Sequence, residues 1–482
     1  MPAAVDLGIR QDQDSSHHIH ECHLDRLKGK RVVFVSPGYP GKRFIFERAF
    51  ELGVLSIVLD SPGSWTAELF RQGIVHRVVF VDMSNSNEKV LQESISALSG
   101  IEGFDAICTF VELSALLTAR LCEHFNVPGH SVGSVELARD KHLTRKAVSS
   151  TGETLQYVIR SRLIEKGTKS ELAEAADFVG FPAVLKPVSG AASLGVRKVA
   201  RFEELLESYS QIQDLLSDLV VSNGALERRL RMQSGDVFDV CKSNCYSSSI
   251  GNTRILLEEY ISGEEVDIDM VLCDGNVTFC EVSDNGPTIE PYFGETYNSC
   301  PSLLSEKDQE ELKQMAFLVA TRALGFHSGV FHVEGKMTLT GPLLVEVNCR
   351  MGGGPIRSVH MARSGVDLVE EQLLLACGIP TIPLALSSEG QVAVGFIDVN
   401  ARRSGSVASL DFLRQFNQRK GMLYCKSMVT AGEHIVGPEE GQPSWLAEAV
   451  FLCDTPEDAH SASLTLYTEI QTLFEKHYVP SP

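Results

Sequence analysis

Acidic, amide and basic side chains alternate along residues 329–354, GVFHVEGKMTLTGPLLVEVNCRMGGG. The apolar and β-branched composition on either side of Thr340-Gly341-Pro342 predicts two strands joined by a turn. Successive side chains of a strand point to opposite faces, so Glu346, Asn348 and Arg350 share one face. With the turn centred near Thr340, Glu334 lies opposite Glu346 on that face.

Two facing carboxylates repel each other, and burying them without a partner costs several kcal/mol more. A Mg²⁺ ion removes this cost, because it binds carboxylate and amide oxygens together with the oxygens of a nucleotide. Arg350 and the run Gly352, Gly353 and Gly354 then offer a planar cation and backbone N–H groups to an anion. A plain surface hairpin is the alternative, but such a polar face mixes Lys and Thr and does not end in Arg-x-Gly-Gly-Gly. We therefore expect an active-site hairpin.

The first part of the chain alternates short apolar strands with helices, which predicts a parallel, doubly wound α/β sheet. The loop SPGYPGKR after the first strand is Gly-rich but is not a dinucleotide fingerprint. The expected strands are 31–36, 56–60, 78–82 and 105–110, with a first helix over 43–52.

Two later segments could bind a nucleotide. Lys186 ends an apolar strand over 181–187, and a loop of small residues follows, whose amides could fold over phosphates. A simple hairpin is an equally good interpretation of that loop. The strand 254–261 contains Glu258-Glu259-Tyr260-Ile261, which could offer backbone groups to adenine, or could be an edge strand with exposed acids.

Bulk properties exclude several partners. A length of 482 residues predicts about three lobes, because single cores stop growing at roughly 250–300 residues. The net charge of −20 argues against a nucleic-acid partner. No run approaches the ~20 apolar residues of a membrane span, and the polar N-terminus lacks a signal-peptide core. Scattered single cysteines then indicate reduced thiols, so we expect a cytoplasmic protein.

A histidine-rich segment near the N-terminus could bind a metal. It contains His17, His18, His20, Cys22 and His23. We favour a flexible polar tail before the first strand.

In their order along the chain, these signals resemble the ATP-grasp superfamily over about residues 30–385. They resemble more closely its carboxylate–amine ligases, a group with the L-amino acid (dipeptide) ligases and the catalytic part of carnosine synthase. The motifs that carry the resemblance are SDNGPT at 283–288, FGET at 293–296, GVFHVE at 329–334 and VEVNCRMGG at 345–353.

The resemblance implies an α/β fold with an α+β lid. A flexible tail over 1–29 would precede a Rossmann-like parallel-sheet domain over 30–145. A mobile lid over 146–257 would follow, with an inserted segment at 208–250, and then the catalytic core over 258–385. An accessory α/β subdomain would occupy 386–482.

The resemblance also implies a role for each matching residue. Arg350 would stabilise the acyl phosphate, and Glu334, Glu346 and Asn348 would hold two Mg²⁺ ions, with Mn²⁺ as a possible substitute. Glu265 would reach the ribose, and Glu295 with the three glycines would contact the amino-acid substrate. The residues expected at ATP are Lys141, Lys186, Ser189, Gly190, Ser193, Gly195, Glu258, Glu259, Tyr260 and Ile261.

The implied reaction joins an amino acid or similar carboxylate to an amine at the expense of ATP, through an acyl phosphate. Small-molecule substrates and a homodimer are expected, with no nucleic acid and no membrane. Two departures from the family pattern stand out: Cys349 replaces Pro, and Gly354 replaces an aromatic residue, which predicts a bulkier second substrate. Two alternatives stay open. One is action on a sugar-phosphate amine, for which Arg357 and Arg363 could serve, and the other is a non-catalytic nucleotide-binding protein.

Overall fold

The computed structural model describes most of the 482 residues. The described ranges are 13–83, 85, 87–190, 193–217, 219–222, 225–228, 254–387, 390–438, 440 and 443–480. Most of the expected insertion at 208–250 lies outside them, apart from the end of a helix and a short hairpin.

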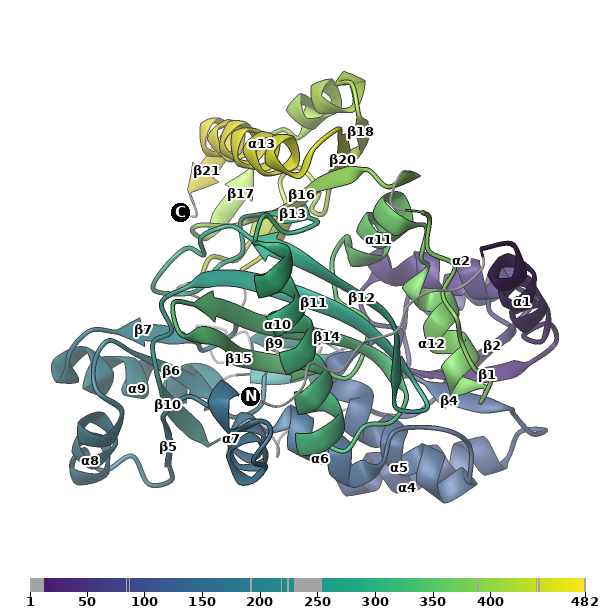
Figure 1. Cartoon of the computed structure of the whole chain (residues 1–482), viewed down its shortest axis with the longest axis horizontal. Coiled ribbons are helices and arrows are strands. Elements are labelled where there is room, and N and C mark those ends of the chain that lie inside the picture. The colour runs from purple at the N-terminus through teal and green to yellow at the C-terminus, as the bar shows by residue number, and fades with distance from the viewer. Residues whose placement is uncertain are drawn as a thin grey trace, which may run out of the picture.

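A parallel four-stranded sheet in the order β3-β2-β1-β4 forms the N-terminal domain (Figure 1). The parallel α/β architecture expected from the alternation of strands and helices is confirmed. Its strands are β1 (Arg31–Val35), β2 (Leu55–Asp60), β3 (Arg77–Phe80) and β4 (Ala106–Cys108). Its helices are α2 (Arg43–Glu51), α3 (Thr66–Arg71), α4 (Asn87–Ser99), α5 (Ala115–Phe125) and α6 (Val132–Arg139), with short 3-10 turns at Pro40–Lys42 and Glu112–Ser114.

The N-terminal segment is not a tail throughout. Residues Gln13–Asp25 form helix α1, which packs beside α12 (Leu368–Ala376). The expectation of a flexible tail is therefore wrong for this stretch. The physical reason is a long-range contact, since buried His20 lies against Glu370 of α12.

The lid is a second four-stranded sheet in the order β5-β10-β6-β7, paired antiparallel throughout. Helix α7 (Lys141–Ser150) and the turn Leu155–Tyr157 lead into it. The lid strand β10 extends to Glu259, so the expected boundary at 257/258 falls inside a strand. Its other elements are β5 (Ser161–Ile164), α8 (Lys169–Val179), β6 (Ala183–Pro187), β7 (Arg197–Val199), α9 (Phe202–Ser217), the hairpin β8 (Leu219–Ser222) and β9 (Ala225–Arg228), and β10 (Ile255–Glu259).

An eight-stranded antiparallel sheet forms the centre of the molecule, in the order β15-β14-β11-β12-β13-β16-β20-β18 (Figure 1). Its last three strands come from the region 386–482, so that region continues the catalytic sheet instead of forming a separate layer. The strands are β11 (Glu264–Cys273), β12 (Asn276–Asn285), β13 (Tyr297–Cys300), β14 (Gly329–Thr338), β15 (Gly341–Asn348), β16 (Ala393–Asn400), β18 (Met422–Ser427) and β20 (Trp445–Cys453). Helix α10 (Glu306–Leu318), with a π-helical turn at Val319–Ala323, and α13 (Pro456–His477) pack on it.

After Pro355 the structure has two helices, α11 (Ile356–Ser364) and α12. Gly365 separates them with a left-handed φ of 79°, and Asp367 caps the second helix by accepting from Val369 N. The small remaining elements are β17 (Gly405–Val407), the 3-10 helix Asp411–Gln418, β19 (His434–Ile435) and β21 (Tyr478–Pro480). Within the described ranges, no helix combines the length and hydropathy of a membrane span.

Candidate active site

Carboxylates of three neighbouring strands form a row across one face of the central sheet. The β14–β15 hairpin has the expected register, with Glu334 opposite Glu346. Strand β11 lies on the other side of β14 and places Asp267 opposite Glu334. Asp267 was not among the predicted site residues, because the sequence gives no sign of which strand pairs with the outer edge of the hairpin.

A register shift next to Glu334 shapes this row. The pairing moves from Glu334 opposite Glu346 to Gly335 opposite Leu344, so Val345 has no counterpart in β14. The Val345 carbonyl accepts a hydrogen bond from Arg145 Nη2 at 2.6 Å. Such bulges re-aim side chains beside active sites, and here the bulge ties the hairpin to helix α7.

The acids of the row cannot all ionise without a cation. Burial and the nearby charge of Glu346 raise the pKa of Glu334 to about 8. Burial likewise raises the pKa of Asp267 to about 6. Burial opposes ionisation of Glu346 too, but Lys141, with Nζ at 2.8 Å from Oε1, keeps the pKa of Glu346 below its usual value.

The oxygen donors at this row fit a hard divalent cation. Asn348 lies beside Glu334, with its Nδ2 at 3.3 Å from Glu334 Oε1, and its side chain lies on the same face of β15 as that of Glu346. Two carboxylates and an amide oxygen form a donor set suited to Mg²⁺ or Mn²⁺.

Two basic side chains beside the carboxylate row, Lys186 and Arg145, are anchored by Glu258. Lys186 Nζ lies 2.5 Å from Glu258 Oε2, and Arg145 Nε donates to Glu258 Oε1 at 2.9 Å. Glu258 is 2% exposed, and both of its carboxylate oxygens are paired with these two cations. Its side chain therefore fixes the orientation of Lys186 and Arg145.

The carboxylate row lines a cavity, and the small-residue loop after β6 borders the same cavity. Gly190, Ser193 and Gly195 line it, whereas Ser189 does not. Gly195 has a φ of 76°, and a Cβ there would meet the Pro187 ring at 3.0 Å, so only glycine fits this turn easily.

The segment expected at adenine also lines the cavity, through Glu259, Tyr260 and Ile261. Lys198 lies over the Tyr260 ring at 3.9 Å from its centroid. Glu265 lines the cavity too, and its carboxylate is paired with Lys336 at 2.8 Å.

Arg350 receives its orientation from the N-terminal domain. Its Nε lies 3.2 Å from Glu112 Oε2, and its Nη2 donates to Asn348 Oδ1 at 3.3 Å. Glu112 is also paired with Arg139 at 3.2 Å. The sequence gives no local signal for Glu112, because its role depends on how two domains meet.

The far end of the cavity is acidic and aromatic. Glu295, Asp398, Tyr39 and Trp445 line it, and the two rings are 5.9 Å apart. Burial, with the nearby charge of Asp267, raises the pKa of Glu295 to about 7, and burial beside Glu295 and Glu448 raises the pKa of Asp398 well above its usual value.

Gly353 and Gly354 open onto this end. A Cβ on Gly354 would lie 3.6 Å from Asp398 Oδ1, whereas Gly352 packs against His332 and Ile356 and does not line the cavity.

A single cavity of about 450 Å³ thus brings together nearly all of the predicted site residues, Ser189 and Gly352 excepted. The residues that the sequence did not indicate come from other strands and from the N-terminal domain. They include Tyr39, Arg145, Arg197, Asp267, Asn285, His332, Asp398 and Trp445.

Two family models match the chain: the ATP-grasp N-terminal domain over residues 46–129 and the ATP-grasp domain over residues 233–358. The solved L-amino acid ligase from Bacillus licheniformis superimposes with a TM-score of 0.71 at 22% identity, covering 94% of this chain and 100% of that one. The chain has the ATP-grasp fold.

Curated ATP-grasp relatives extend the comparison. Carnosine synthase 1 from Gallus gallus is 31% identical over 419 residues, which are 84% of this chain and 41% of that protein. The alanine–anticapsin ligase of Bacillus subtilis (strain 168) is 26% identical over 301 residues, covering 61% of this chain and 58% of the ligase. The chain spans less than half the length of the carnosine synthases that it matches.

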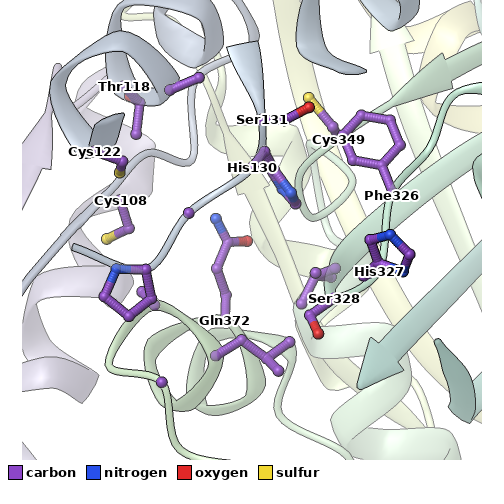
Figure 2. Close-up of a pocket in the computed structure, with 18 of the residues that line it drawn as sticks. Cys108, Thr118, Cys122, His130, Ser131, Phe326, His327, Ser328, Cys349 and Gln372 are labelled. Carbon is purple, nitrogen blue, oxygen red and sulfur yellow. The ribbon is translucent and has the colours of Figure 1, made fainter. Parts of the chain in front are cut away.

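The ATP-grasp chain contains a second cavity, of about 460 Å³, between the N-terminal domain and helix α12 (Figure 2). Cys108, Cys122, Phe326 and Gln372 are among its lining residues, and none of the described residues that line it is Lys or Arg. It therefore lacks the cations that a nucleotide needs, and the candidate active site is the first cavity.

Proposed function

We propose that this protein is an ATP-dependent carboxylate–amine ligase that forms an amide bond between two amino acids or amino-acid-like substrates. One observation carries the proposal. The Glu334, Glu346 and Asn348 donors share a cavity with two lysines and Arg350. A cation site beside phosphate-binding cations suits phosphoryl transfer, and Arg350 adds a donor for charge that develops on an acyl oxygen.

In the proposed reaction, a substrate carboxylate oxygen attacks the γ-phosphorus of ATP and the bond to the β,γ-bridging oxygen breaks. This step gives an acyl phosphate and ADP. The neutral amine of the second substrate then attacks the acyl carbon, the C–O bond to phosphate breaks, and the amide nitrogen loses a proton to solvent. Bound Mg²⁺, which we place at Glu334, Glu346 and Asn348 as two ions replaceable by Mn²⁺, would neutralise charge on the β- and γ-phosphates.

The protein's own groups position and protect these reactants. Lys141 and Lys186 offer ammonium groups to the phosphates, and the loop with Gly190, Ser193 and Gly195 offers backbone N–H groups. Adenine would lie along 259–261, with Glu265 within reach of the ribose. Excluding water matters because water would hydrolyse the acyl phosphate.

The far end of the cavity supports a finer proposal about the second substrate. Glu295 and Asp398 are buried acids, and Trp445 adds an aromatic wall. An ammonium, imidazolium or guanidinium group would stabilise the ionised carboxylates and stack on the ring. We therefore propose a second amino acid with a cationic or aromatic side chain, a size that the absence of a side chain at Gly354 accommodates.

The alternative of a sugar-phosphate amine receives less support. Arg357 is paired bidentately with Asp367 at 2.8 and 2.5 Å, and Arg363 lies 3.5 Å from Glu281. Neither arginine lines the cavity, so neither is placed for a substrate phosphate. A purely nucleotide-binding protein would have no need of Arg350. A homodimer remains a proposal from the family resemblance, to be checked by sedimentation.

The test measures ADP and phosphate release from ATP·Mg²⁺ with amino acids supplied singly and in pairs. The pairs combine small amino acids with basic, aromatic and acidic ones, and mass spectrometry identifies the products. Release that requires two amino acids, gives a dipeptide mass and disappears in Glu346→Ala supports the ligase. If no pair stimulates release although ATP binds, the proposal fails.

A further inference from the structure

Three acid or imidazole side chains meet where the N-terminal helix packs on α12. His20 Nε2 lies 3.3 Å from Glu370 Oε2, and His20 Nδ1 lies 4.0 Å from Glu371 Oε1. The side chains of His20, Glu370 and Glu371 are only 8%, 9% and 1% exposed. One nitrogen or oxygen from each residue lies within 4.8 Å of the other two.

Arginines neutralise the neighbouring acids but not Glu371. Arg48 contacts Glu370 Oε1 through Nε at 2.8 Å, and Arg357 holds Asp367. Among the described residues no Lys or Arg is paired with Glu371, and its Oε2 and His20 Nδ1 are buried with no hydrogen-bond partner. A buried carboxylate oxygen without a hydrogen-bond or ionic partner destabilises the folded state, so a bound cation would stabilise this cluster.

The spacing of the donors identifies the kind of partner. Zinc bonds to histidine nitrogen and carboxylate oxygen are about 2.0–2.2 Å long, which sets tetrahedral ligands roughly 3.3–3.5 Å apart. His20 faces Glu370 with Nε2 and Glu371 with Nδ1, and an ion binds only one of these nitrogens. One donor atom from each residue lies within 4.8 Å of the other two, so small side-chain rotations bring three donors to the tetrahedral spacing. We infer that His20, Glu370 and Glu371 form a binding site for a divalent transition metal, of which Zn²⁺ is the best match to one imidazole and two carboxylates.

The surroundings favour a structural role for this site. Arg48 holds the second oxygen of Glu370 and so fixes the orientation of that ligand. The ion would connect α1 to α12, whose next residue, Gln372, donates to the Thr109 carbonyl at 2.6 Å and accepts from Met351 N at 3.4 Å. It would thus stabilise the contact between the N-terminal domain and the segment after Arg350. This inference does not depend on the proposed ligase activity.

The first test uses Co²⁺ as a spectroscopic substitute for Zn²⁺, on the full chain without a histidine tag. Saturating Mg²⁺ is added first, so that the oxygen donors around Glu346 are occupied. We expect a visible ligand-field absorption at one equivalent of Co²⁺ that Zn²⁺ displaces. His20→Ala and Glu371→Gln should abolish it, whereas His18→Ala, from the same helix, and Glu346→Ala should retain it.

A second test measures thermal stability as Tm, which also shows whether each variant is folded. Without metal, Glu371→Gln replaces an unpaired buried acid by a neutral isostere, so its Tm should equal or exceed that of the wild type. Added Zn²⁺ should raise the Tm of the wild type by several degrees and leave that of Glu371→Gln unchanged. Absence of the Co²⁺ band, its survival in both cluster variants, or an equal Zn²⁺ effect on wild type and Glu371→Gln would overturn the inference.

Discussion

The proposed role of Arg350 depends on Glu112, a residue that does not line the cavity. Its guanidinium lies against the buried Glu112 carboxylate of the N-terminal domain. We expect Glu112→Gln to lower kcat for amide formation about tenfold, a loss of about 1.4 kcal/mol of transition-state stabilisation. The KM for ATP should stay unchanged, because Glu112 does not line the cavity. Steady-state kinetics with the substrate pair that the ADP-release assay selects measures both values.

The matched comparison is Arg350→Ala, which removes the donor itself. Loss of one such donor costs about 10²–10³-fold in kcat. An unchanged kcat in Glu112→Gln would show that Arg350 is positioned without Glu112. An increase in the KM for ATP alone would place Glu112 at the nucleotide.

Glu258 contributes to the stability of the folded site, through its ion pairs, more than to the reaction chemistry. Burial opposes its ionisation, but Arg145 and Lys186 hold the pKa of Glu258 below 4.5, its ordinary value. Glu258→Gln would leave two buried cations unpaired, so we expect the free energy of unfolding to fall by about 3 kcal/mol at neutral pH. A depressed acid stabilises the fold above its unfolded pKa. The difference between variant and wild type should therefore shrink as pH falls below about 4.5.

Urea unfolding over a pH series checks this prediction. Glu259→Gln is the matched control, since it removes the neighbouring acid from an exposed pair with Arg160, whose side chain is 60% exposed. Exposed pairs contribute about 0–1 kcal/mol. Equal destabilisation by both variants would contradict the special role of Glu258.

At the scale of elements, we expect the turn that follows β15 to set the size of the acidic and aromatic end of the cavity. Gly354 has a φ of 56°, and its missing side chain faces Asp398 and Trp445. We expect Gly354→Trp to raise the KM for a bulky or cationic second substrate at least about tenfold, the cost of losing roughly 1.4 kcal/mol of binding. Turnover with a small second substrate such as alanine should persist.

Two smaller substitutions separate bulk from backbone strain. Gly354→Ala places a non-glycine residue in the left-handed conformation, which costs about 1–2 kcal/mol of stability. The methyl group adds little volume to the cavity. Gly353→Ala faces open space. If Gly354→Ala impairs the bulky substrate as strongly as Gly354→Trp, strain and not pocket size is the cause.

At the scale of the whole molecule, the lid is a separate unit with its own apolar core. That core includes Leu172, Leu185 and Leu257. The lid meets the rest of the chain through polar contacts, among them Lys198 with Glu290 at 2.7 Å and Arg254 with Asp140 at 2.6 Å. We therefore expect the lid to move as a unit about these contacts.

We expect a non-hydrolysable ATP analogue with Mg²⁺ to slow amide hydrogen exchange across residues 183–199. Bound phosphates would order the loop and bring the lid closer, while the already buried central strands β11 and β14 should change little. Hydrogen-exchange mass spectrometry measures this difference, with Glu346→Ala as the control that weakens metal binding. Equal protection throughout the molecule, or none in the lid, would rule out nucleotide-driven closure.

The features that arise from local geometry could be predicted from the amino-acid sequence alone. Side-chain alternation in a strand is a property of the backbone, so the facing of Glu334 and Glu346 could be predicted from their distance to the turn. The parallel N-terminal sheet likewise followed from the alternation of short apolar strands and helices.

Contacts between distant parts of the chain could not be predicted in this way, because they depend on how the strands and domains pack. Asp267, Glu112 and Asp398 reach the site through strand order and domain contact, neither of which leaves a local pattern. Helix α1 was taken for a tail for the same reason, since its polar sequence becomes ordered against α12. Local periodicity fixes the face on which a side chain lies, but burial and charge partners depend on long-range contacts.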